Sequence, residues 1–409
     1  MLKKLILSIL FSIPLLSFAG GFQINLQGQK QTGMGHTGVG LLSDASTVLF
    51  NPGAMSFLDS NYRISVGMNL LFPRVTYQEL MPGNYTAETV HNIGTPFTFY
   101  GTWKLKNLEK LSIGLGIYTP FGSKMQWEDD WLGQFLIREI DLKTIFFQPT
   151  VSYKLSDDFG IGLGLIYATG SFGLRKGVPV QDVNLEYGEG VLNGKASGYG
   201  FNAGMYFKAS DNLTFGFDYR SAVKTSINNG TASFTVPSSL SEYFPSTTFN
   251  TNIKLPSVLT LGIGYSLKKF KFALDINQVG WKSYDSLVID FADNTDKLAD
   301  IHSARKYKDS FIIRIGAEYV LNKTLTFRMG SYFDKTPVQD GYLTPETPDV
   351  NKIGITAGLS LRPTKFMSID FSFLFIEGQR RTDTNLETDF GGTYKSRALV
   401  PGIGFEFIF

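Results

Sequence analysis

The chain has 409 residues, with 43 glycines, no cysteine and a formal net charge of +2. The absence of cysteine excludes disulfide bonds and thiol-based metal sites, and the mixed charges give no indication of nucleic-acid binding. Aromatic side chains make up 14% of the residues and the mean hydropathy is close to zero, which fits either a soluble β-rich protein or an outer-membrane barrel with an apolar outside and a polar inside.

The first nineteen residues, MLKKLILSILFSIPLLSFA, have the composition of a secretory signal peptide. Two lysines precede an apolar run, and Ser17 and Ala19 place small residues at positions −3 and −1 of a cleavage site after Ala19. A retained membrane anchor is the alternative, but the run is short and no other apolar run of spanning length follows. We therefore predict that residues 1–19 are removed.

Residues 20–60 are rich in small residues and do not alternate between apolar and polar positions. After LLSDAS, either Ser43 or Asp44 could cap a short helix that continues to Leu49. The Asn51-Pro52-Gly53 sequence would then stop this helix. The segment has two short apolar runs and no strand of its own, so its packing depends on the rest of the chain.

From residue 61 onward the chain contains fourteen segments with a period of two, which predicts fourteen β-strands. Links of a few polar residues follow the even-numbered segments up to the twelfth, and links of roughly 15–30 residues follow the odd-numbered ones, without exception. This pattern is typical of an all-β, antiparallel outer-membrane barrel with short periplasmic turns and long extracellular loops, and a soluble β-sandwich would not need it. The predicted segments are 61–72, 94–106, 111–121, 141–155, 158–175, 194–208, 212–226, 251–267, 270–282, 308–321, 324–335, 352–363, 366–378 and 396–409.

The alternation also predicts which face of each strand meets lipid. In 366–378, for example, Phe371, Phe373 and Phe375 share one face, and Asp370 lies on the other. A charge facing lipid at the middle of the bilayer would cost about 2–4 kcal/mol, so the charged residues of these strands should face the lumen. They could form an ion-paired network that supports the wall, which we favour over a transport site. The predicted lumen residues are Asp218, Arg220, Asp275, Arg314, Glu318, Arg328 and Asp370.

Aromatic residues such as Trp103, Tyr153 and Tyr167 gather near the strand ends, where amphipathic rings prefer the headgroup level. The chain ends in FEFIF, with Phe409 last. A terminal aromatic residue on an alternating strand resembles the signal read by the outer-membrane assembly machinery, and an ordinary edge strand is the alternative.

A fourteen-stranded barrel is wide enough to leave a lumen that must be open or plugged. Residues 20–60 have apolar patches that would be unstable in the periplasm, and they can pack inside such a barrel. We therefore predict three parts, namely a signal peptide at 1–19, an N-terminal hatch at 20–60 and the barrel at 61–409.

Two of the long links could capture an apolar ligand. The sequence TVPSSLSEYFPSTTF (235–249) could form a short amphipathic helix that exposes Leu240, Tyr243 and Phe244, and WEDDWLGQFL (127–136) contains Trp131. Exposed apolar patches on extracellular loops suit the capture of a hydrophobic molecule. The alternative is that these side chains fold inward as loop packing.

Several stretches, taken in order, resemble the FadL/TodX family of outer-membrane transporters for hydrophobic compounds. They cover essentially the whole mature chain and include GGFQIN at its start, the DAS…NP element, PFGSKMQWEDDWLGQF (120–135), LPSVLTLGIGY (255–265) and DSFIIRIGAEYVLNKTLTFRMGSYFDKTPV (309–338). The chain departs from the family at Asn51-Pro52-Gly53-Ala54, where a glycine separates proline from alanine and is expected to loosen the turn.

The resemblance implies a barrel plugged by a hatch, capture at the outer loops, a pocket at the mature N-terminus and sideways release near a kinked third strand. It places Phe22, Gln23 and Ile24 at the pocket. It assigns Asn51, Pro52 and Gly53 to the hatch and its gating. The third strand carries Gly114, Gly116 and Pro120, and since glycine and proline weaken strand pairing, these three are the candidates for the kink.

An enzyme is a weak alternative, because the three histidines, His36, His91 and His302, have no nucleophile and acid placed beside them on an alternating face. No metal or cofactor motif is present in the sequence. The stronger alternatives are a hydrophilic porin and a surface adhesin, neither of which needs a hatch. We expect a monomer that passes hydrophobic molecules by diffusion, either long-chain fatty acids, whose carboxylate would want a nearby Arg or Lys, or aromatic hydrocarbons and other lipids.

Overall fold

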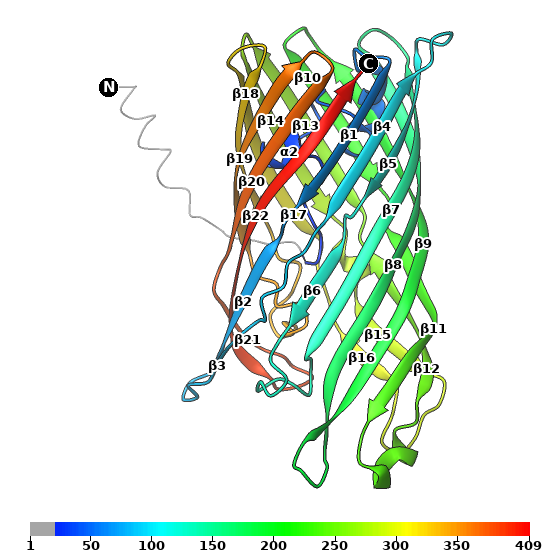
Figure 1. Ribbon diagram of the computed structural model, residues 1–409, viewed down its shortest axis with the longest axis vertical. Helices are drawn as coiled ribbons and strands as arrows, with labels where there is room; N and C mark the ends of the chain where they lie inside the picture. Colours follow the sequence, from blue (N-terminus) through cyan, green and yellow to red (C-terminus); the bar gives the residue numbers. More distant parts are fainter. Residues whose placement is uncertain (1–20) are drawn as a thin grey trace.

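The structure is a computed structural model that describes residues 21–409, so the predicted signal peptide lies outside the described residues. Residues from Tyr62 onward form one closed antiparallel barrel, and the preceding segment lies inside it (Figure 1). The last strand, β22 (Gly391–Ile408), pairs with the first, β1 (Tyr62–Asn69), which closes the wall. The prediction of fourteen wall strands is confirmed.

Six wall strands are single elements, and each of the other eight is interrupted and consists of two. The single ones are β7 (Glu139–Lys154), β8 (Phe159–Gln181), β9 (Tyr187–Lys208), β18 (Leu325–Asp334), β19 (Lys352–Thr364) and β22. The divided ones are β1 with β2 (Phe72–Glu79), β3 (Thr86–Glu88) with β4 (Phe97–Lys104), β5 (Leu111–Tyr118) with β6 (Gly122–Gln126), β10 (Leu213–Arg220) with β11 (Val223–Thr235), β12 (Thr247–Leu255) with β13 (Val258–Leu267), β14 (Phe270–Val279) with β15 (Ser286–Phe291), β16 (Ile301–Ala304) with β17 (Ser310–Val320), and β20 (Met367–Gly378) with β21 (Arg381–Thr384).

Several strands are longer than the alternation predicted. The β8–β9 hairpin runs on until only residues 182–186 link the two strands, although 176–193 was expected to be a loop. Outside the bilayer the outward face of a strand is free to be polar, so the apolar half of the alternation disappears while the backbone pairing continues. The sequence pattern therefore marked the membrane-embedded part of each strand.

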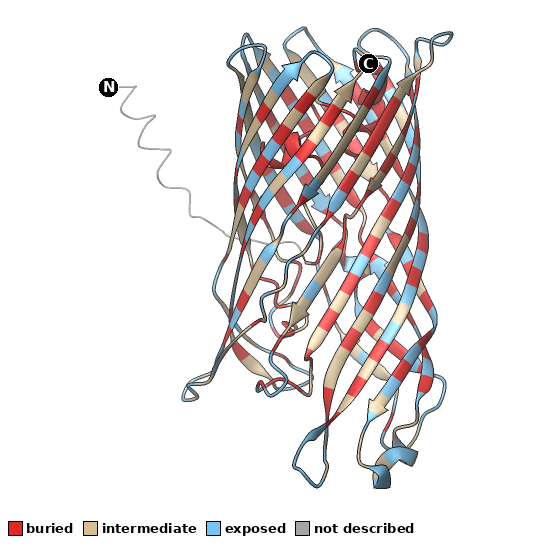
Figure 2. Cartoon of the chain, viewed as in Figure 1, coloured by how far each residue is buried: buried red, intermediate tan, exposed pale blue. Residues whose placement is uncertain are grey.

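Burial alternates along the strands (Figure 2), and the outward face of the barrel is apolar. On β14, Phe270, Phe272 and Ile276 are more than 40% exposed, whereas Asp275 is 1% exposed and faces the lumen. All seven charged residues that were predicted to face the lumen are buried.

The predicted ion-paired network exists only in part. Glu318 pairs with Arg328 at 2.7 Å, and Asp370 lies 3.9 Å from Lys30 of the hatch. Arg314 instead donates to the side chain of Asn277, and Asp275 accepts hydrogen bonds from backbone N–H groups of the hatch.

The hatch contains three short helices, α2 (Gln29–Thr32), α3 (Thr47–Phe50) and the 3₁₀ helix η1 (Pro52–Phe57). The side chain of Asp44 accepts a hydrogen bond from Ser46 N just before α3, and η1 begins directly after Asn51. The predicted short helix is present, but its N-cap is Ser46, without a side-chain capping hydrogen bond, and not Ser43 or Asp44, and it ends one residue later than expected. None of the helices in residues 21–409 is long and apolar enough to cross a membrane.

The hatch meets the wall backbone to backbone, through glycines. A Cβ added to Gly53 would lie 2.7 Å from the carbonyl oxygen of Gly204 on β9 and 2.8 Å from that of Gly160 on β8. On the wall, a Cβ added to Gly316 would lie 2.3 Å from the carbonyl oxygen of Met34. The close approach of the wall gives Gly53 a role that the sequence did not indicate, because a side chain at this position would collide with the backbone of β8 and β9.

Candidate functional site

The third wall strand is broken between β5 and β6. β5 pairs with β7 as far as Tyr118↔Phe146, and β6 resumes the pairing at Gly122↔Lys143. Three residues, including Pro120, thus stand opposite two residues of β7, which is the geometry of a β-bulge. Proline cannot donate to a ladder, and this is consistent with a break at its position.

The neighbouring second wall strand does not cover the edge of β6. β4 pairs with β5 only as far as Thr98↔Tyr118, β3 pairs only with β2, and β6 pairs only with β7. At the far end of β6, Val90 N donates to the carbonyl oxygen of Gln126 at 2.8 Å. Between these two points the strand ladder of the wall is interrupted.

The N-terminal segment occupies this free edge. Gln23 forms an antiparallel bridge with Phe121, flanked by hydrogen bonds from Ile24 N to Pro120 O at 2.9 Å and from Gly122 N to Phe22 O at 3.1 Å. The side chain of Gln27 donates to the carbonyl oxygen of Thr119 at 2.9 Å. The backbone groups that a wall neighbour would normally satisfy are therefore bound by residues 22–27.

Phe22 is 7% exposed and lies in an aromatic cluster inside the barrel. Its ring stands edge-on to Trp281 at 4.8 Å, to Tyr284 at 5.5 Å and to Phe121 at 6.2 Å between centroids. A Cβ added to Gly21 would lie 2.5 Å from the ring of Trp281, so the chain passes close against that ring.

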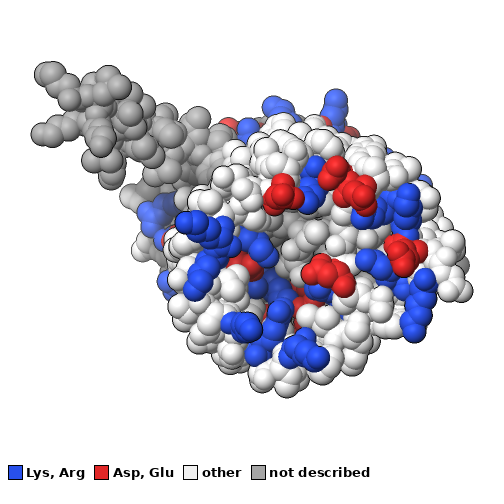
Figure 3. Space-filling model, turned by 90° about the horizontal axis from the view of Figure 1, so that it is seen from above, with Lys and Arg blue, Asp and Glu red and all other residues white. Residues whose placement is uncertain are grey.

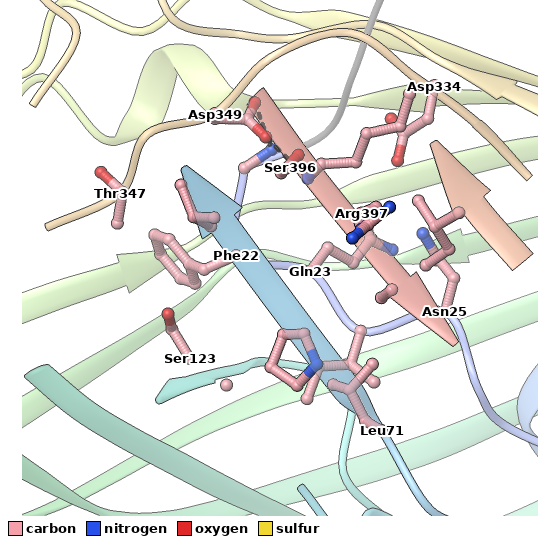
Figure 4. Close-up of a pocket in the computed structure, with 18 of the residues that line it drawn as sticks. Phe22, Gln23, Asn25, Leu71, Ser123, Asp334, Thr347, Asp349, Ser396 and Arg397 are labelled. Carbon is pink, nitrogen blue, oxygen red and sulfur yellow. Dashed lines mark hydrogen bonds and ion pairs between the residues drawn. The ribbon is translucent and has the colours of Figure 1, made fainter. Parts of the chain in front are cut away.

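Three cavities touch the N-terminal segment, one of them polar and lined by Gln23, Asn25 and Gln27, and the other two meet at Phe22. The larger one has an empty volume of about 990 Å³, partly open to solvent, and is lined by residues 21–26 together with Leu71, Met125, Leu374 and Ile376 among others. In Figure 4, Phe22, Ser123 and Thr347 lie on one side of this cavity, and Asn25 and Leu71 lie on the other. The smaller cavity is lined by Ile140, Leu142, Phe172 and Leu174 and shares Phe22, Ser123 and Thr347 with the larger one. Phe22 therefore stands between the two cavities.

Charged groups lie around the larger cavity. Lys352 pairs with Asp349 at 2.7 Å, and Asp349 also accepts a hydrogen bond from Gly21 N at 2.9 Å. Arg74 pairs with Glu88. Arg397 also lines this cavity but is exposed, on the outward-facing row of β22, where it stands opposite Arg74 and Glu377 in the ladders; it has no carboxylate within 4 Å among residues 21–409.

The two glycines predicted at the kink do not lie there. Gly114 and Gly116 belong to the regularly paired part of β5, opposite Thr102 and Tyr100 of β4. A Cβ added to Gly114 would lie 2.7 Å from side-chain atoms of Met55 and Val48, both in the hatch. These glycines make room for the hatch, and of the three candidates Pro120 alone lies at the break.

Asn51 fixes the hatch to the wall. It is fully buried, its amide donates to the carbonyl oxygens of Val39 at 2.9 Å and Met205 at 2.8 Å, and its Oδ1 accepts from Gly53 N. Pro52 begins η1, where the lack of an N–H costs nothing. Asn51, Pro52 and Gly53 therefore hold the hatch closely against strands β8 and β9.

The loop residues differ from one another in exposure. Trp131 is 1% exposed, stacks on Trp127 at 4.4 Å between ring centroids and donates to the carbonyl oxygen of Ile137, so it is loop packing and presents no apolar surface in this conformation. The predicted helix in 235–249 is the 3₁₀ helix η2 (Ser238–Tyr243). Tyr243 is 39% exposed, Leu240 is half-buried, and Phe244 is half-buried beside Phe234.

His36 is buried in the hatch, and its Nε2 accepts a hydrogen bond from Gln27 N at 3.2 Å. Burial, and to a smaller extent the guanidinium groups of Arg314 and Arg220, hold the pKa of His36 well below its usual value. Its role is to support the N-terminal segment. Residues 21–409 contain no group of three or more His, Asp or Glu side chains that could hold a metal ion.

Comparisons with known proteins agree with this architecture. The family model for outer membrane transport proteins (OMPP1/FadL/TodX) matches residues 11–409. A long-chain fatty acid transport protein of Salmonella typhi is 24% identical over 392 residues, which cover 89% of this chain and 88% of the relative. A 47 kDa outer membrane protein of Pasteurella multocida is 25% identical over 419 residues, covering 96% and 94%.

Solved structures show the same fold. A FadL homologue from Pseudomonas aeruginosa aligns with a TM-score of 0.84 at 17% identity, over 95% of this chain and all of that one. The toluene transporter TodX of P. putida aligns with a TM-score of 0.74 at 16% identity, over 93% and 98%. The chain therefore belongs to the OMPP1/FadL/TodX family of non-enzymatic outer-membrane proteins, which transport hydrophobic compounds across the outer membrane of Gram-negative bacteria.

Proposed function

We propose that this protein takes up long-chain fatty acids by diffusion, binds them in the cavity at Phe22, Gln23 and Ile24, and releases them sideways through the break beside β6. One observation carries the proposal. Residues 22–24 line the larger cavity and also occupy the free edge of the third wall strand, so displacing them would open the cavity toward the bilayer.

The order of the cavities supports a route. Leu240, Tyr243 and Phe244 are the capture candidates at the loop end of the barrel. The smaller apolar cavity follows, and Phe22 separates it from the larger cavity, which reaches Gly122 and Met125 of β6 at the break. Sideways exit spares an apolar chain from entering water, which would otherwise cost about 0.8 kcal/mol per methylene group.

The moving part in this proposal is the N-terminal segment, residues 21–27. Asn51 and Gly53 make close backbone and hydrogen-bond contacts with β8 and β9, and shifting them would break buried hydrogen bonds. Residues 22–24 are held by two backbone hydrogen bonds to the broken strand and by ring contacts of Phe22. Because residues 22–24 lie on the broken strand, whereas Asn51 and Gly53 lie against unbroken ones, we place the gate in the N-terminal segment, in front of a fixed hatch.

Arg397 is our proposed contact for a fatty-acid carboxylate. It lines the larger cavity (Figure 4) from the exposed, outward-facing row of β22, beside the opening of that cavity to solvent, and has no carboxylate within 4 Å among the described residues, since Glu377 opposite it pairs with Lys395. A hydrogen bond to a charged group contributes about 1.5–3 kcal/mol, which is enough to favour a carboxylate over a neutral ligand by at least about tenfold.

Aromatic hydrocarbons are the second candidate substrates. The aromatic cluster around Phe22, formed by Phe121, Trp281 and Tyr284, offers ring edges and faces to a flat apolar molecule. Binding to these rings needs no carboxylate. Loss of Arg397 should therefore weaken the uptake of a fatty acid and leave the uptake of an aromatic hydrocarbon unchanged.

Uptake of labelled oleate and labelled toluene by Gram-negative cells that lack their own transporter tests both candidates. The variants are a deletion of residues 21–26, which stops short of the hatch contacts of Gln29 and Lys30, and Arg397→Gln. The matched control is Lys395→Gln, which removes the same charge from the same strand but at a site paired with Glu377. Insertion is checked by heat-dependent migration in gels.

We expect oleate uptake with the intact chain and its loss in the deletion. Arg397→Gln should lower oleate uptake about tenfold and leave toluene uptake unchanged. Absence of oleate uptake by a correctly inserted intact chain would refute fatty acids as substrates, and normal uptake by the deletion would refute the role of the N-terminal segment.

Two further proposals concern assembly. Phe409 is 61% exposed at the end of the closing strand, as expected for a residue read by the assembly machinery. One chain closes the whole barrel, so we propose a monomer.

A further inference from the structure

Four lysines form a one-sided basic stripe on the outer surface of the barrel, at the end that carries the long loops. The basic stripe consists of Lys143 on β7, Lys195 on β9, Lys224 on β11 and Lys254 on β12. All four are exposed, and their strands belong to five consecutive wall strands, of which only β8 contributes no lysine.

Each of these lysines comes directly beyond the lipid-facing band of its strand. On β9, outward Phe207, Met205, Phe201 and Tyr199 are 40–78% exposed, and Lys195 is the first charged residue that follows them on this face. On β7 the outward row Tyr153, Val151 and Phe147 likewise precedes Lys143. The basic stripe therefore lies where the apolar band gives way to the headgroup layer of the outer leaflet.

The register of the strands brings the lysines together. Lys224 stands directly opposite Lys254, and Lys143 and Lys195 both stand opposite Ser171 on β8, on its two sides. Like charges directly opposite each other destabilise a sheet. An arrangement that places cationic side chains side by side is stabilised by an anion between them.

The protein itself does not supply that anion. Among residues 21–409, Lys195, Lys224 and Lys254 have no carboxylate within 4 Å, and only Lys143 has one, Asp141 at 2.7 Å. Among the outward basic residues on the other side, Arg74 pairs with Glu88 and Lys395 with Glu377, whereas Arg397 has no carboxylate within 4 Å among residues 21–409.

The short-turn end of the barrel is different. Basic and acidic side chains are intermixed around its rim (Figure 3), and Lys154 and Lys208 pair with the turn residues Asp157 and Asp211. Some lysines of this rim, such as Lys268 and Lys323, also have no carboxylate within 4 Å among residues 21–409, so the basic stripe is defined by its row of lysines on one side of the barrel, beside the apolar band.

We propose that the basic stripe binds the phosphate groups of an anionic lipid in the outer leaflet, a phosphorylated glycolipid of the lipopolysaccharide type. Its acyl chains would lie on the apolar face below Tyr167 and Tyr199, whose rings are 5.3 Å apart. Two phosphates on one headgroup would match two groups of lysines, Lys224 with Lys254 and, four residues further along the wall, Lys195 with Lys143. This inference does not depend on the transported substrate.

Native mass spectrometry of the full-length protein in detergent tests the proposal, with diphosphoryl lipid A, dephosphorylated lipid A and inorganic phosphate as probes. The test variant combines Lys195→Gln, Lys224→Gln and Lys254→Gln. The matched control combines Lys154→Gln, Lys208→Gln and Lys269→Gln, which removes the same charge at the short-turn end. A third variant with arginine at positions 195, 224 and 254 keeps the charge and serves as a second test.

We expect diphosphoryl lipid A to bind the intact protein, the control and the arginine variant, and to bind the glutamine variant at least about tenfold more weakly. Oleate uptake should be the same in all of them. Equal binding by the glutamine variant would overturn the proposal. Equal binding of dephosphorylated lipid A would also overturn it, because phosphate would then not be recognised, and so would inorganic phosphate binding as tightly as the lipid.

Discussion

Gln23 and Phe121 face each other as an antiparallel pair at the break in the third wall strand. The hydrogen bonds that flank them run from Ile24 N to Pro120 O and from Gly122 N to Phe22 O, so the pair itself is of the non-hydrogen-bonded kind. The Cα atoms of such pairs lie about 4.5 Å apart, which is within the range that a disulfide bond can span. A disulfide bond between positions 23 and 121 can therefore hold the N-terminal segment against the wall.

A disulfide between positions 23 and 121 should stop transport. The chain has no cysteine, so the double variant Gln23→Cys/Phe121→Cys would carry a single possible bridge. We expect oxidised cells to lose uptake of the transported compound and a reducing agent to restore it, since the bridge prevents the N-terminal segment from leaving the edge of β6. Uptake by oxidised and reduced cells is the measurement.

The two single cysteine variants are the controls for this experiment, because they carry the same changes without a bridge. Equal uptake before and after reduction, with the bridge demonstrated by mass spectrometry, would show that the N-terminal segment does not need to move.

Gly53→Ala should destabilise the protein although it adds a single methyl group. The added Cβ would come within 2.8 Å of the carbonyl oxygens of both Gly160 and Gly204, and backbone atoms of two wall strands cannot yield cheaply. Overpacking of this kind costs about 1–3 kcal/mol. Urea unfolding in detergent micelles measures it, with Gly173→Ala as the control, because a Cβ there would be no closer than 3.4 Å to any neighbour. Equal midpoints for the two variants would contradict the close docking.

The barrel could be predicted from the sequence because strand alternation and link length are local properties. The site could be predicted only in part. Gly114, Gly116 and Gly53 were assigned to a kink or a turn, whereas their small size is required by contacts between the hatch and strands far away in the chain. Trp131 was a capture candidate with loop packing as the alternative; Trp127 and Tyr77 cover it, and no periodic pattern could decide between the two.

Acid should loosen the N-terminal segment through His36. The pKa of His36 is held well below its usual value of about 6.5 by burial and by Arg314 and Arg220. In a state in which the N-terminal segment has left the edge of β6, His36 would be exposed and would take up a proton below about pH 6.5. In the closed state the buried His36 does not, so the closed state loses stability relative to the open one as the pH falls. Protonation would also occupy the Nε2 atom that accepts from Gln27 N.

Hydrogen–deuterium exchange of the peptide that covers residues 21–28, corrected for intrinsic rates, checks this at pH 7.5 and 5.5. We expect faster exchange at the lower pH, and a smaller difference in His36→Gln, which keeps an acceptor but cannot titrate. The same pH dependence in both proteins would exclude His36 as its source.

Glu406 should contribute more to stability than any exposed carboxylate of the wall. It is 1% exposed on the closing strand β22, and it binds both Lys30 of the hatch and Arg63 of the first strand, the latter at 3.0 Å. Glu406→Gln would leave Arg63 beside a neutral amide and Lys30 with Asp370 alone, at 3.9 Å, and breaking a buried pair in this way costs about 3–5 kcal/mol. Glu377→Gln is the matched control, because Glu377 pairs with Lys395 on the outer surface, where such pairs are worth about 0–1 kcal/mol. We expect a large fall in the urea midpoint for the first variant and a small one for the second. Similar falls would mean that the hatch and the seam of the barrel do not depend on their shared carboxylate.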